Sequence, residues 1–508
     1  RIPPAGPYHP AGSIDPSRMR RRRSYGLIEV APVLFVCGLL LVTLSVAMLL
    51  PALVDLVAGY DDWQVFATAS GITLFVGVLL VLTNRRGPLR LGLRQAFLLT
   101  SASWMVVALF GALPFAFSDL EMSFTDSVFE SVSGVTTTGS TVIVGLDYAP
   151  PGILIWRALL QWLGGIGIIV TAVALLPLLQ VGGMQLFRTE STDQSDKISP
   201  RVAQIALGII SVYLGATALW ALFIWGAGLS PFDAVAHAMT TIATGGFSTV
   251  DASIGHFADP TLEWIVTAGM LASAMPYVLY VQALRGRPAL LWRDEQVRGL
   301  LGIVVGAVLA LAVAHALLNG IEPMEALRHV AFNAVSVMTG TGYATTDFGA
   351  WGPFATIGFF FLMFIGGCAG STTCGIKVFR VQILFSAARS QIARLVQPHG
   401  VFVATYNRRP IPEPVIESVI AFLILYFLCY AALAAALGLM GLDFLTATSG
   451  AATAISNVGP GLGDIIGPTG TFAPLPDAAK WLLSFGMLLG RLELFTILVL
   501  FLPSFWRA

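Results

Sequence analysis

The chain has 508 residues, of which 56% are hydrophobic and only 11% are charged, and its formal net charge is zero. Soluble domains carry about 25% charged residues, so this chain lacks the charge needed to cover a water-exposed surface. The composition excludes an ordinary soluble domain and predicts a polytopic membrane protein. A neutral chain also gives no electrostatic support for binding nucleic acid.

Residues 1–25 are polar, basic and Pro-rich, and we expect them to form a cytoplasmic N-terminal segment. Two apolar runs near 27–57 and 63–82 then predict two transmembrane helices within residues 26–94. Eight later runs are also long enough to cross a bilayer, near 95–117, 150–180, 202–227, 259–284, 299–319, 351–385, 413–439 and 475–505. The expected fold is therefore all-α.

Four amphipathic runs between these spans are too short to cross, near 122–134, 231–243, 322–338 and 443–455. Each leads into a loop rich in small residues: "VTTTGSTV", "TTIATGGFST", "SVMTGTGYATTDF" and "ISNVGPGLG". The order span, short helix, loop, span thus occurs four times, which predicts four units around a common axis. We expect these repeats to occupy residues 95–190, 191–290, 291–400 and 401–508.

The four loops can be aligned on one glycine each, at Gly139, Gly245, Gly342 and Gly459. Backbone at membrane depth must be paired or must line a watery path, and glycine allows carbonyl groups to turn toward one axis. Rings of carbonyl oxygens can replace the water shell of a cation, and the C-termini of the short helices favour positive charge there. Close helix packing is the alternative, but four loops in register favour a pseudo-fourfold cation pore.

The span near 351–385 contains a run of small residues, Gly366–Gly375, with four glycines. Because each glycine costs a helix about 1 kcal/mol relative to alanine, we expect a break, with unwound backbone lining a cavity. A packing kink is the alternative. The stretch "GSTTCGIK" has one residue too many before Lys377 to be a phosphate loop.

Arg491 lies inside the last predicted span, and a charge in a membrane is a functional hypothesis by default. The alternative is an ion pair with an acid on another span. Glu493 is a poor direct partner for Arg491, because residues two apart on a helix point in different directions. We expect Lys377 and Arg380 to reach the cytoplasmic interface.

Together these motifs resemble the Trk/Ktr/HKT superfamily of potassium transporters, and over residues 27–507 the chain is most similar to TrkH-type bacterial potassium uptake subunits. Beyond the loops, the resemblance is carried by "RALLQWLGGIGIIV", "GGMQLFRTES", "LWRDEQVR", "GGCAGSTTCGIKVFR" and "MLLGRLELFTILVLF". It implies a selectivity filter that binds the potassium ion through Thr137, Thr138, Gly139, Ala243, Thr244, Gly245, Gly340, Thr341, Gly342, Asn457, Val458 and Gly459.

In related plant transporters, serine at the first filter glycine accompanies sodium preference, so Gly139 favours potassium here. The resemblance also implies a gate below the filter, formed by an intramembrane loop and Arg491. The gating residues are Gly366, Gly367, Gly370, Ser371, Thr372, Gly375, Lys377 and Arg491. The fourth loop has Asn457 and Pro460 where the others have Thr or Gly, so the ring should not be truly fourfold.

The resemblance further implies potassium uptake, as a symporter, across the bacterial inner (plasma) membrane, with both termini cytoplasmic. The implied partners are a second copy of the chain, a TrkA-like cytosolic nucleotide-binding regulatory subunit and membrane lipid, without nucleic acid or an organic cofactor. A sodium or mixed sodium/potassium transporter and the pore subunit of an ATP-driven potassium pump remain alternatives. We expect no enzymatic activity, since the sequence has no HExxH, GxSxG or Walker motif.

Overall fold

The computed structural model describes residues 29–85, 92–174 and 200–506. In these ranges the chain is helical apart from loops and one small antiparallel hairpin, β1 (Thr405–Tyr406) and β2 (Arg409–Pro410). The predicted all-α membrane fold is therefore confirmed. The N-terminal segment 1–25 and the stretch "GGMQLFRTES" lie outside the described residues.

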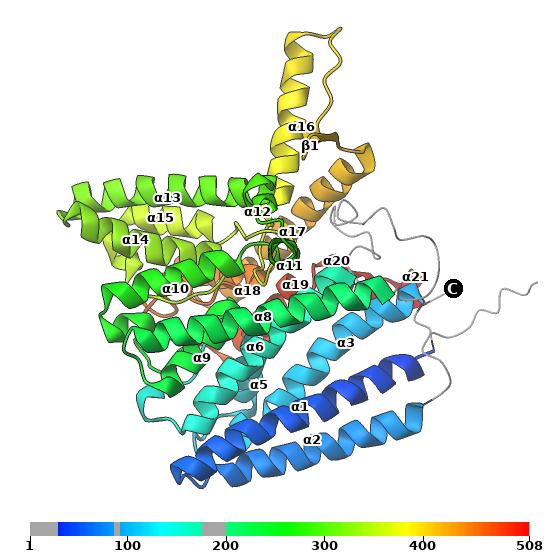
Figure 1. Ribbon diagram of the computed structural model, residues 1–508, viewed down its shortest axis with the longest axis vertical. Coiled ribbons are helices and arrows are strands. Elements are labelled where there is room, and N and C mark those ends of the chain that lie inside the picture. The colour runs from blue at the N-terminus through cyan, green and yellow to red at the C-terminus, as the bar shows by residue number, and fades with distance from the viewer. Residues whose placement is uncertain (1–28, 86–91, 175–199, 507–508) are drawn as a thin grey trace, which may run out of the picture.

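The chain begins with a helical hairpin, α1 (Ala31–Ala58) and α2 (Trp63–Asn84), which lies at the opposite edge of the molecule from α13 (Glu295–Asn319) (Figure 1). Gly59, with φ of 80°, ends α1 in the left-handed conformation that glycine adopts easily. The two helices touch at their backbones, because a Cβ atom on Gly38 would lie 2.9 Å from the Gly77 carbonyl oxygen. This is the small-residue packing expected between membrane helices.

The remaining helices follow the predicted order. The region of the first repeat contains α3 (Leu93–Gly111), α4 (Leu113–Phe117), α5 (Phe124–Val135) and α6 (Pro151–Ala174), and that of the second contains α8 (Pro200–Gly226), α9 (Pro231–Ile242), α10 (Pro260–Ser273) and α11 (Tyr277–Leu284). The third has α12 (Ala289–Arg293), α13, α14 (Pro323–Met338), α15 (Pro353–Leu362) and α16 (Val378–Val396). The fourth has α17 (Glu413–Leu439), α18 (Phe444–Ser456), α19 (Asp477–Arg491), α20 (Phe495–Leu498) and α21 (Pro503–Trp506). Short 3-10 turns lie between them at Leu146–Tyr148, Ser253–Phe257, Phe348–Trp351 and Val499–Phe501. The exact repeat boundaries stay predictions.

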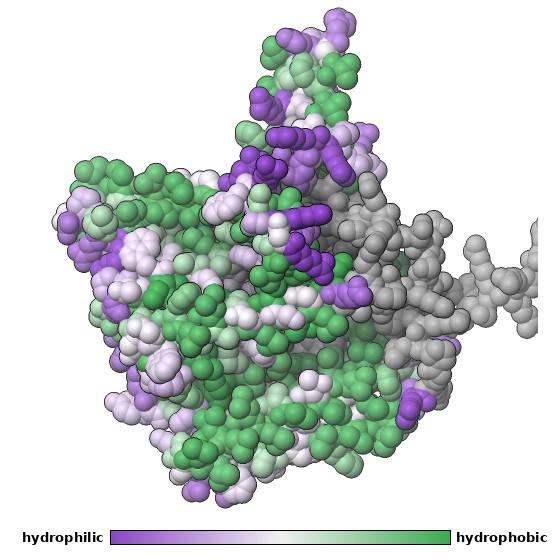
Figure 2. All heavy atoms as spheres, viewed as in Figure 1, coloured by the Kyte–Doolittle hydropathy of each residue, from purple (hydrophilic) through white to green (hydrophobic). Residues whose placement is uncertain are grey.

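Apolar side chains dominate the outer surface of the helical body, while hydrophilic residues gather near α16 (Figure 2). Phe75 on α2 and Leu222 on α8 are 70% and 59% exposed. Within the described residues, seven helices are long and apolar enough to cross a membrane, and two bent helix pairs raise this number to nine. An apolar outer surface of this kind fits lipid rather than water, so the chain is a multi-pass membrane protein.

The expected break in the span near 351–385 is present. Helix α15 ends at Leu362 and α16 begins at Val378. Helix α16 then runs to Val396, beyond the predicted end, and rises away from the rest of the molecule beside the hairpin β1–β2 (Figure 1).

Two other predicted spans, near 259–284 and 475–505, each contain a sharp bend that was not predicted. The first bends by 94° between α10 and α11, and the second bends by 108° between α19 and α20. Pro276 accounts for the first bend, since proline lacks an N–H donor and disfavours helical torsions in the residue before it. At the second, Glu493 has a φ of 58°.

The short helices start at capping residues. The hydroxyl groups of Ser123 and Ser230 accept the N–H groups of Asp126 and Asp233, each at 3.1 Å, and the Asp443 carboxylate caps α18 in the same way. These bonds satisfy N–H groups that a helix leaves free in its first turn. The caps therefore fix where α5, α9 and α18 begin, whereas α14 starts at Pro323 without a side-chain cap.

The contact between Gly38 and Gly77 gives a testable prediction. Gly77→Ile should push α1 and α2 apart and lower the thermal unfolding temperature in detergent, because overpacking of this kind costs about 1–3 kcal/mol. Gly71→Ile is the matched control on the same helix, since a Cβ atom there meets nothing within 4 Å. Equal unfolding temperatures for the two variants would contradict the proposed backbone contact.

Candidate functional site

The four loops share one backbone turn. A residue with left-handed torsions follows each short helix within two residues, and two residues later comes a glycine with positive φ. The left-handed residues are Thr137, Thr244, Gly340 and Asn457, and the glycines are Gly139, Gly246, Gly342 and Gly459. The N–H group between them bonds to the carbonyl five residues back in every loop, for example from Thr138 to Ser133 at 2.9 Å. Such bonds pair carbonyl groups that a helix C-terminus leaves free.

This turn corrects the register of the second loop. Gly246, with φ of 76°, is equivalent to Gly139, and Gly245 is equivalent to Thr138 one position earlier. A Cβ atom on Gly245 would face the Gln161 side chain at 2.3 Å rather than the next loop. The two glycines are adjacent, so the alignment of the sequence on Gly245 was one residue early.

The loops meet one another in a closed cycle. A Cβ atom on each positive-φ glycine would run into a carbonyl oxygen of a neighbouring loop. Such a Cβ atom would lie 2.3 Å from the Gly245 oxygen if added to Gly139, and 1.8 Å from the Thr341 oxygen if added to Gly246. It would lie 2.2 Å from the Val458 oxygen if added to Gly342, and 2.9 Å from the Thr138 oxygen if added to Gly459. The first loop thus touches the second, the second the third, the third the fourth and the fourth the first. Only glycine leaves room for this ring.

Side-chain hydrogen bonds connect the fourth loop to the first. The Asn457 amide donates to the Thr138 hydroxyl at 2.8 Å, and the Ser140 hydroxyl donates to the Gly459 carbonyl at 2.7 Å. The fourth loop is therefore joined to the ring through Asn457, a residue that distinguishes its sequence from those of the other loops. The predicted loop residues, including Ala243, are buried, except that Gly139 and Gly342 are partly exposed.

Helix α6 supports the first two loops from outside the ring. Arg157 is buried and pairs with Glu130 of α5 at 2.8 Å, and its guanidinium also donates to the Ser248 carbonyl at 2.8 Å. One turn further along, Gln161 donates to the Gly245 carbonyl at 2.6 Å and accepts the Phe247 N–H at 3.0 Å. Two residues of one helix therefore hold loops from two repeats.

A position seven residues before each left-handed residue also supports the loops. Glu130 accepts the Val142 N–H at 2.9 Å, His237 bonds to the Ser248 hydroxyl at 3.0 Å, and Asn333 donates to the Thr345 hydroxyl at 2.9 Å. The fourth residue is Gly450, which packs near Ile466 instead. This set was not predicted because its members differ in chemistry, although an alignment of the loops on their left-handed residues places all four in one column.

The segment 363–377 between α15 and α16 lies against this ring. The Thr244 hydroxyl donates to the Thr372 hydroxyl at 3.0 Å, which joins the second loop to the segment. The bend between α10 and α11 provides further partners: Cys368 N–H bonds to the Ala274 carbonyl at 2.9 Å, and Tyr277 N–H to the Gly370 carbonyl at 3.0 Å. The unpredicted bend in the sixth span thus satisfies backbone groups of the predicted break.

Seven of the eight predicted gating residues lie in this segment, and the eighth, Arg491, contacts it from α19. Gly370 and Gly375 have positive φ, and the Gly367 N–H bonds to the Thr373 hydroxyl at 3.1 Å. Gly366, Ser371 and Thr372 are buried beside them. A cavity next to the segment is lined by residues that include Ser371, Thr373, Cys374, Lys377, Arg491 and Glu493.

Arg491 joins the segment to α6. Its guanidinium donates to the Thr372 carbonyl at 3.0 Å, to the Cys374 sulfur at 2.9 Å and to the Gly164 carbonyl at 3.0 Å. It is 1% exposed. Arg491 therefore contacts both the segment beneath the ring and the helix that holds the ring.

Two expectations about charged residues near this segment are wrong. Lys377 and Arg380 were expected at the membrane interface, but both are buried. The Lys377 ammonium bonds to the Thr373 carbonyl, and Arg380 pairs with Glu493. As expected, Glu493 does not pair with Arg491; its partner Arg380 is 113 residues away and could not be found from helical spacing.

Comparisons with known proteins agree with this geometry. A family model described as TrkH, cation transport protein, matches residues 63–507. The chain is 48% identical over 488 residues to the Trk system potassium uptake protein TrkI of Halomonas elongata, covering 96% of this chain and 99% of that relative. It is 39% identical over 477 residues to the Trk system potassium uptake protein TrkH of Escherichia coli, covering 93% and 98%.

A crystal structure of the potassium transporter TrkH from Vibrio parahaemolyticus superimposes with a TM-score of 0.88 at 38% identity, covering 94% of this chain and all of that one. Membrane-length helices around a closed ring of loops, together with these matches, define a multi-pass membrane protein of the cation transport class. The chain belongs to the TrkH family.

The buried pair of Arg157 and Glu130 gives a second prediction. Glu130→Ala leaves the Arg157 guanidinium buried without its carboxylate, so the variant should lose about 3–5 kcal/mol of stability in denaturant unfolding. Glu263→Ala is the control: its partner Arg328, at 2.8 Å, is 21% exposed and can be hydrated. That variant should lose less. A Glu130→Ala loss no larger than the control's would show that the pair does not hold the ring together.

Proposed function

We propose that this chain takes up potassium ions through the ring of loops, which serves as the selectivity filter. The observation that carries the proposal is the closed cycle of close approaches, in which a glycine of each loop lies against a carbonyl group of a neighbouring loop. Rings of backbone carbonyls can replace the hydration shell of a dehydrated cation. The names of the relatives, potassium uptake proteins and a potassium transporter, support potassium as the ion.

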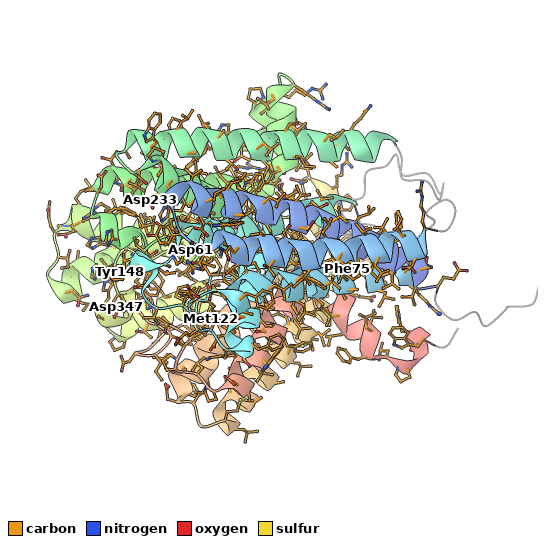
Figure 3. The ribbon with its side chains drawn as sticks, turned by 90° about the horizontal axis from the view of Figure 1, so that it is seen from below. Asp61, Phe75, Met122, Tyr148, Asp233 and Asp347 are labelled. Atoms are coloured by element: carbon orange, nitrogen blue, oxygen red, sulfur yellow. The ribbon has the colours of Figure 1, made fainter. Side chains whose placement is uncertain are left out.

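In this proposal the ion is bound by backbone oxygens of Thr137, Thr138, Gly139, Ala243, Thr244, Gly245, Gly246, Gly340, Thr341, Gly342, Asn457, Val458 and Gly459. The four short helices direct their C-terminal partial negative charge toward the ring and add to its attraction for a cation. Asp61, Asp233 and Asp347 lie toward the same end of the molecule (Figure 3). Acids gathered at one end raise the local cation concentration by field focusing.

Flow through the filter is controlled, in this proposal, by the segment 363–377 and Arg491. The fixed positive charge of the guanidinium raises the barrier for a cation leaving the filter. The contact of Thr372 with both Thr244 and Arg491 supports this role. Gly366, Gly367, Gly370, Ser371, Gly375 and Lys377 allow or hold the unwound backbone.

We place the protein in the bacterial inner membrane with both termini in the cytoplasm. It works there as a dimeric symporter with a nucleotide-binding regulatory subunit. The family supports these assignments. The exposed basic residues Arg285, Arg287, Arg389 and Arg394 favour a cytoplasmic position for the segment 285–298 and for the projecting part of α16.

The filter assignment predicts the effect of one substitution. Gly342→Ser should abolish rescue of a potassium-uptake-deficient bacterium on low potassium, or strongly raise sodium flux, because its side chain would meet the Val458 carbonyl at 2.2 Å. Gly59→Ser is the matched control: its φ of 80° is close to the 85° of Gly342, but a Cβ atom there meets nothing within 4 Å. Full rescue by Gly342→Ser, with unchanged sodium flux, would refute the filter.

The gate assignment predicts that a substitution of Arg491 raises the flux of potassium. Arg491→Gln removes the charge beside Thr372 and should raise basal potassium flux into proteoliposomes by about tenfold, the effect of a barrier lowered by about 1.4 kcal/mol. Lys480→Gln removes a charge from the same helix, where Lys480 pairs with Asp126 at 2.6 Å, and should not raise flux. Unchanged or reduced flux in Arg491→Gln would contradict a barrier role.

A further inference from the structure

The hairpin α1–α2 lies outside the four repeats, and its contact with α6 identifies a role for it. Helix α6 starts at Pro151, after Pro150, so no serine, threonine or acid of its own sequence stands at the capping position. Pro151 has no N–H group, and the N–H groups of Ile153 and Leu154 bond to the Pro150 carbonyl at 3.0 and 3.3 Å. The Gly152 N–H is left as the first-turn donor that needs a partner.

Asp55, in the last turn of α1, supplies that partner. Its Oδ1 accepts the Gly152 N–H at 2.5 Å, and Asp55 is completely buried. A carboxylate at a helix N-terminus satisfies a free donor and also faces the positive end of the helix dipole. Asp55 thus caps α6 from another helix. A Cβ atom on Gly152 would lie 2.0 Å from the Asp55 Oδ2, so glycine is required for this approach.

A second contact supports the same end of α6. The Phe66 ring of α2 meets the Trp156 ring edge to face, with centroids 6.2 Å apart. Leu44 and Met48 of α1 belong to the same buried apolar cluster as Ile153 and Trp156. The hairpin therefore contacts the first two turns of α6 through both a polar cap and apolar packing.

The next turns of α6 hold the ring. Arg157 and Gln161 bond to the second loop, and Gly164 lies so close to the first loop that a Cβ atom would be 2.0 Å from the Val135 carbonyl oxygen. A helix advances about 1.5 Å per residue, so about 14 Å of continuous helix separates Gly152 from Gln161. A shift of the capped end is passed along this rigid element to two loops.

We propose that the hairpin α1–α2 sets the ion selectivity of the filter by fixing the position of α6, with Asp55 as the positioning residue. This inference rests on the proposed function, because it assigns selectivity to the ring. Asp55 does not touch the ion path in this proposal; it acts through α6, Arg157 and Gln161.

The test compares the ratio of rubidium to sodium uptake in proteoliposomes that contain the purified full chain. Asp55→Ala should lower this ratio about fivefold, the factor that corresponds to the ~1 kcal/mol of one lost helix cap. Asp55→Asn keeps an acceptor oxygen and should retain most of the ratio. Gly152→Ala keeps the Asp55 side chain but pushes its carboxylate away from the start of α6, so it should lower the ratio to the same extent. This variant provides the test if Asp55→Ala does not fold.

Two controls separate capping from general loosening of the hairpin. Asp119→Ala removes an exposed acid from the segment after α4 and should leave the ratio unchanged. Gly77→Ile disturbs the contact between α1 and α2 at Gly38 and should lower stability without changing the ratio.

Gly342→Ser is the reference for the filter itself. If Asp55→Ala and Gly152→Ala keep the normal ratio while Gly342→Ser lowers it, the inference is wrong and the proposed function stands. If Gly342→Ser also keeps the normal ratio, the proposed function fails and the inference fails with it. A loss in Asp55→Asn equal to that in Asp55→Ala would overturn the capping explanation.

Discussion

The site depends on a steric constraint: at the four points where the loops meet, there is no room for a Cβ atom. Each loop presents the α-carbon of a glycine to a carbonyl oxygen of a neighbour, at distances that any side chain would violate. Because the contacts form a cycle, no loop can move toward or away from the axis without disturbing the next one. The constraint thus couples four segments that lie far apart in the sequence into one unit.

The support behind this ring is chemically unequal although the backbone turn is repeated. A carboxylate, an imidazole, an amide and a glycine occupy the equivalent position in the four short helices, and the first three each bond to the segment that follows their own loop. Helix α6 adds Arg157 and Gln161 to the first two loops only. A single chain allows this inequality, because each repeat can solve the problem of holding its loop with different side chains.

Local signals in the sequence predicted much of this arrangement. Long apolar runs predicted the spans, short amphipathic runs predicted the short helices, and a glycine-rich run predicted the break after α15. The bend at Glu493 could not be predicted because no residue near it in the sequence favours a bend. The ion-pair partner of Glu493 is Arg380, from another repeat. The register of the second loop was predicted one residue early because both Gly245 and Gly246 fit the alignment of the four loops. Predicting these features requires knowledge of which segments meet in space.

The pair of Arg380 and Glu493 also has a mechanical consequence. Arg380 lies in the first turn of α16, the helix that projects from the body, and Glu493 lies two residues after Arg491 in the chain. A displacement at the root of α16 would therefore pull on the backbone next to Arg491 directly, through an ion pair shielded from solvent. One buried salt bridge thus joins the projecting helix α16 to the backbone that follows Arg491.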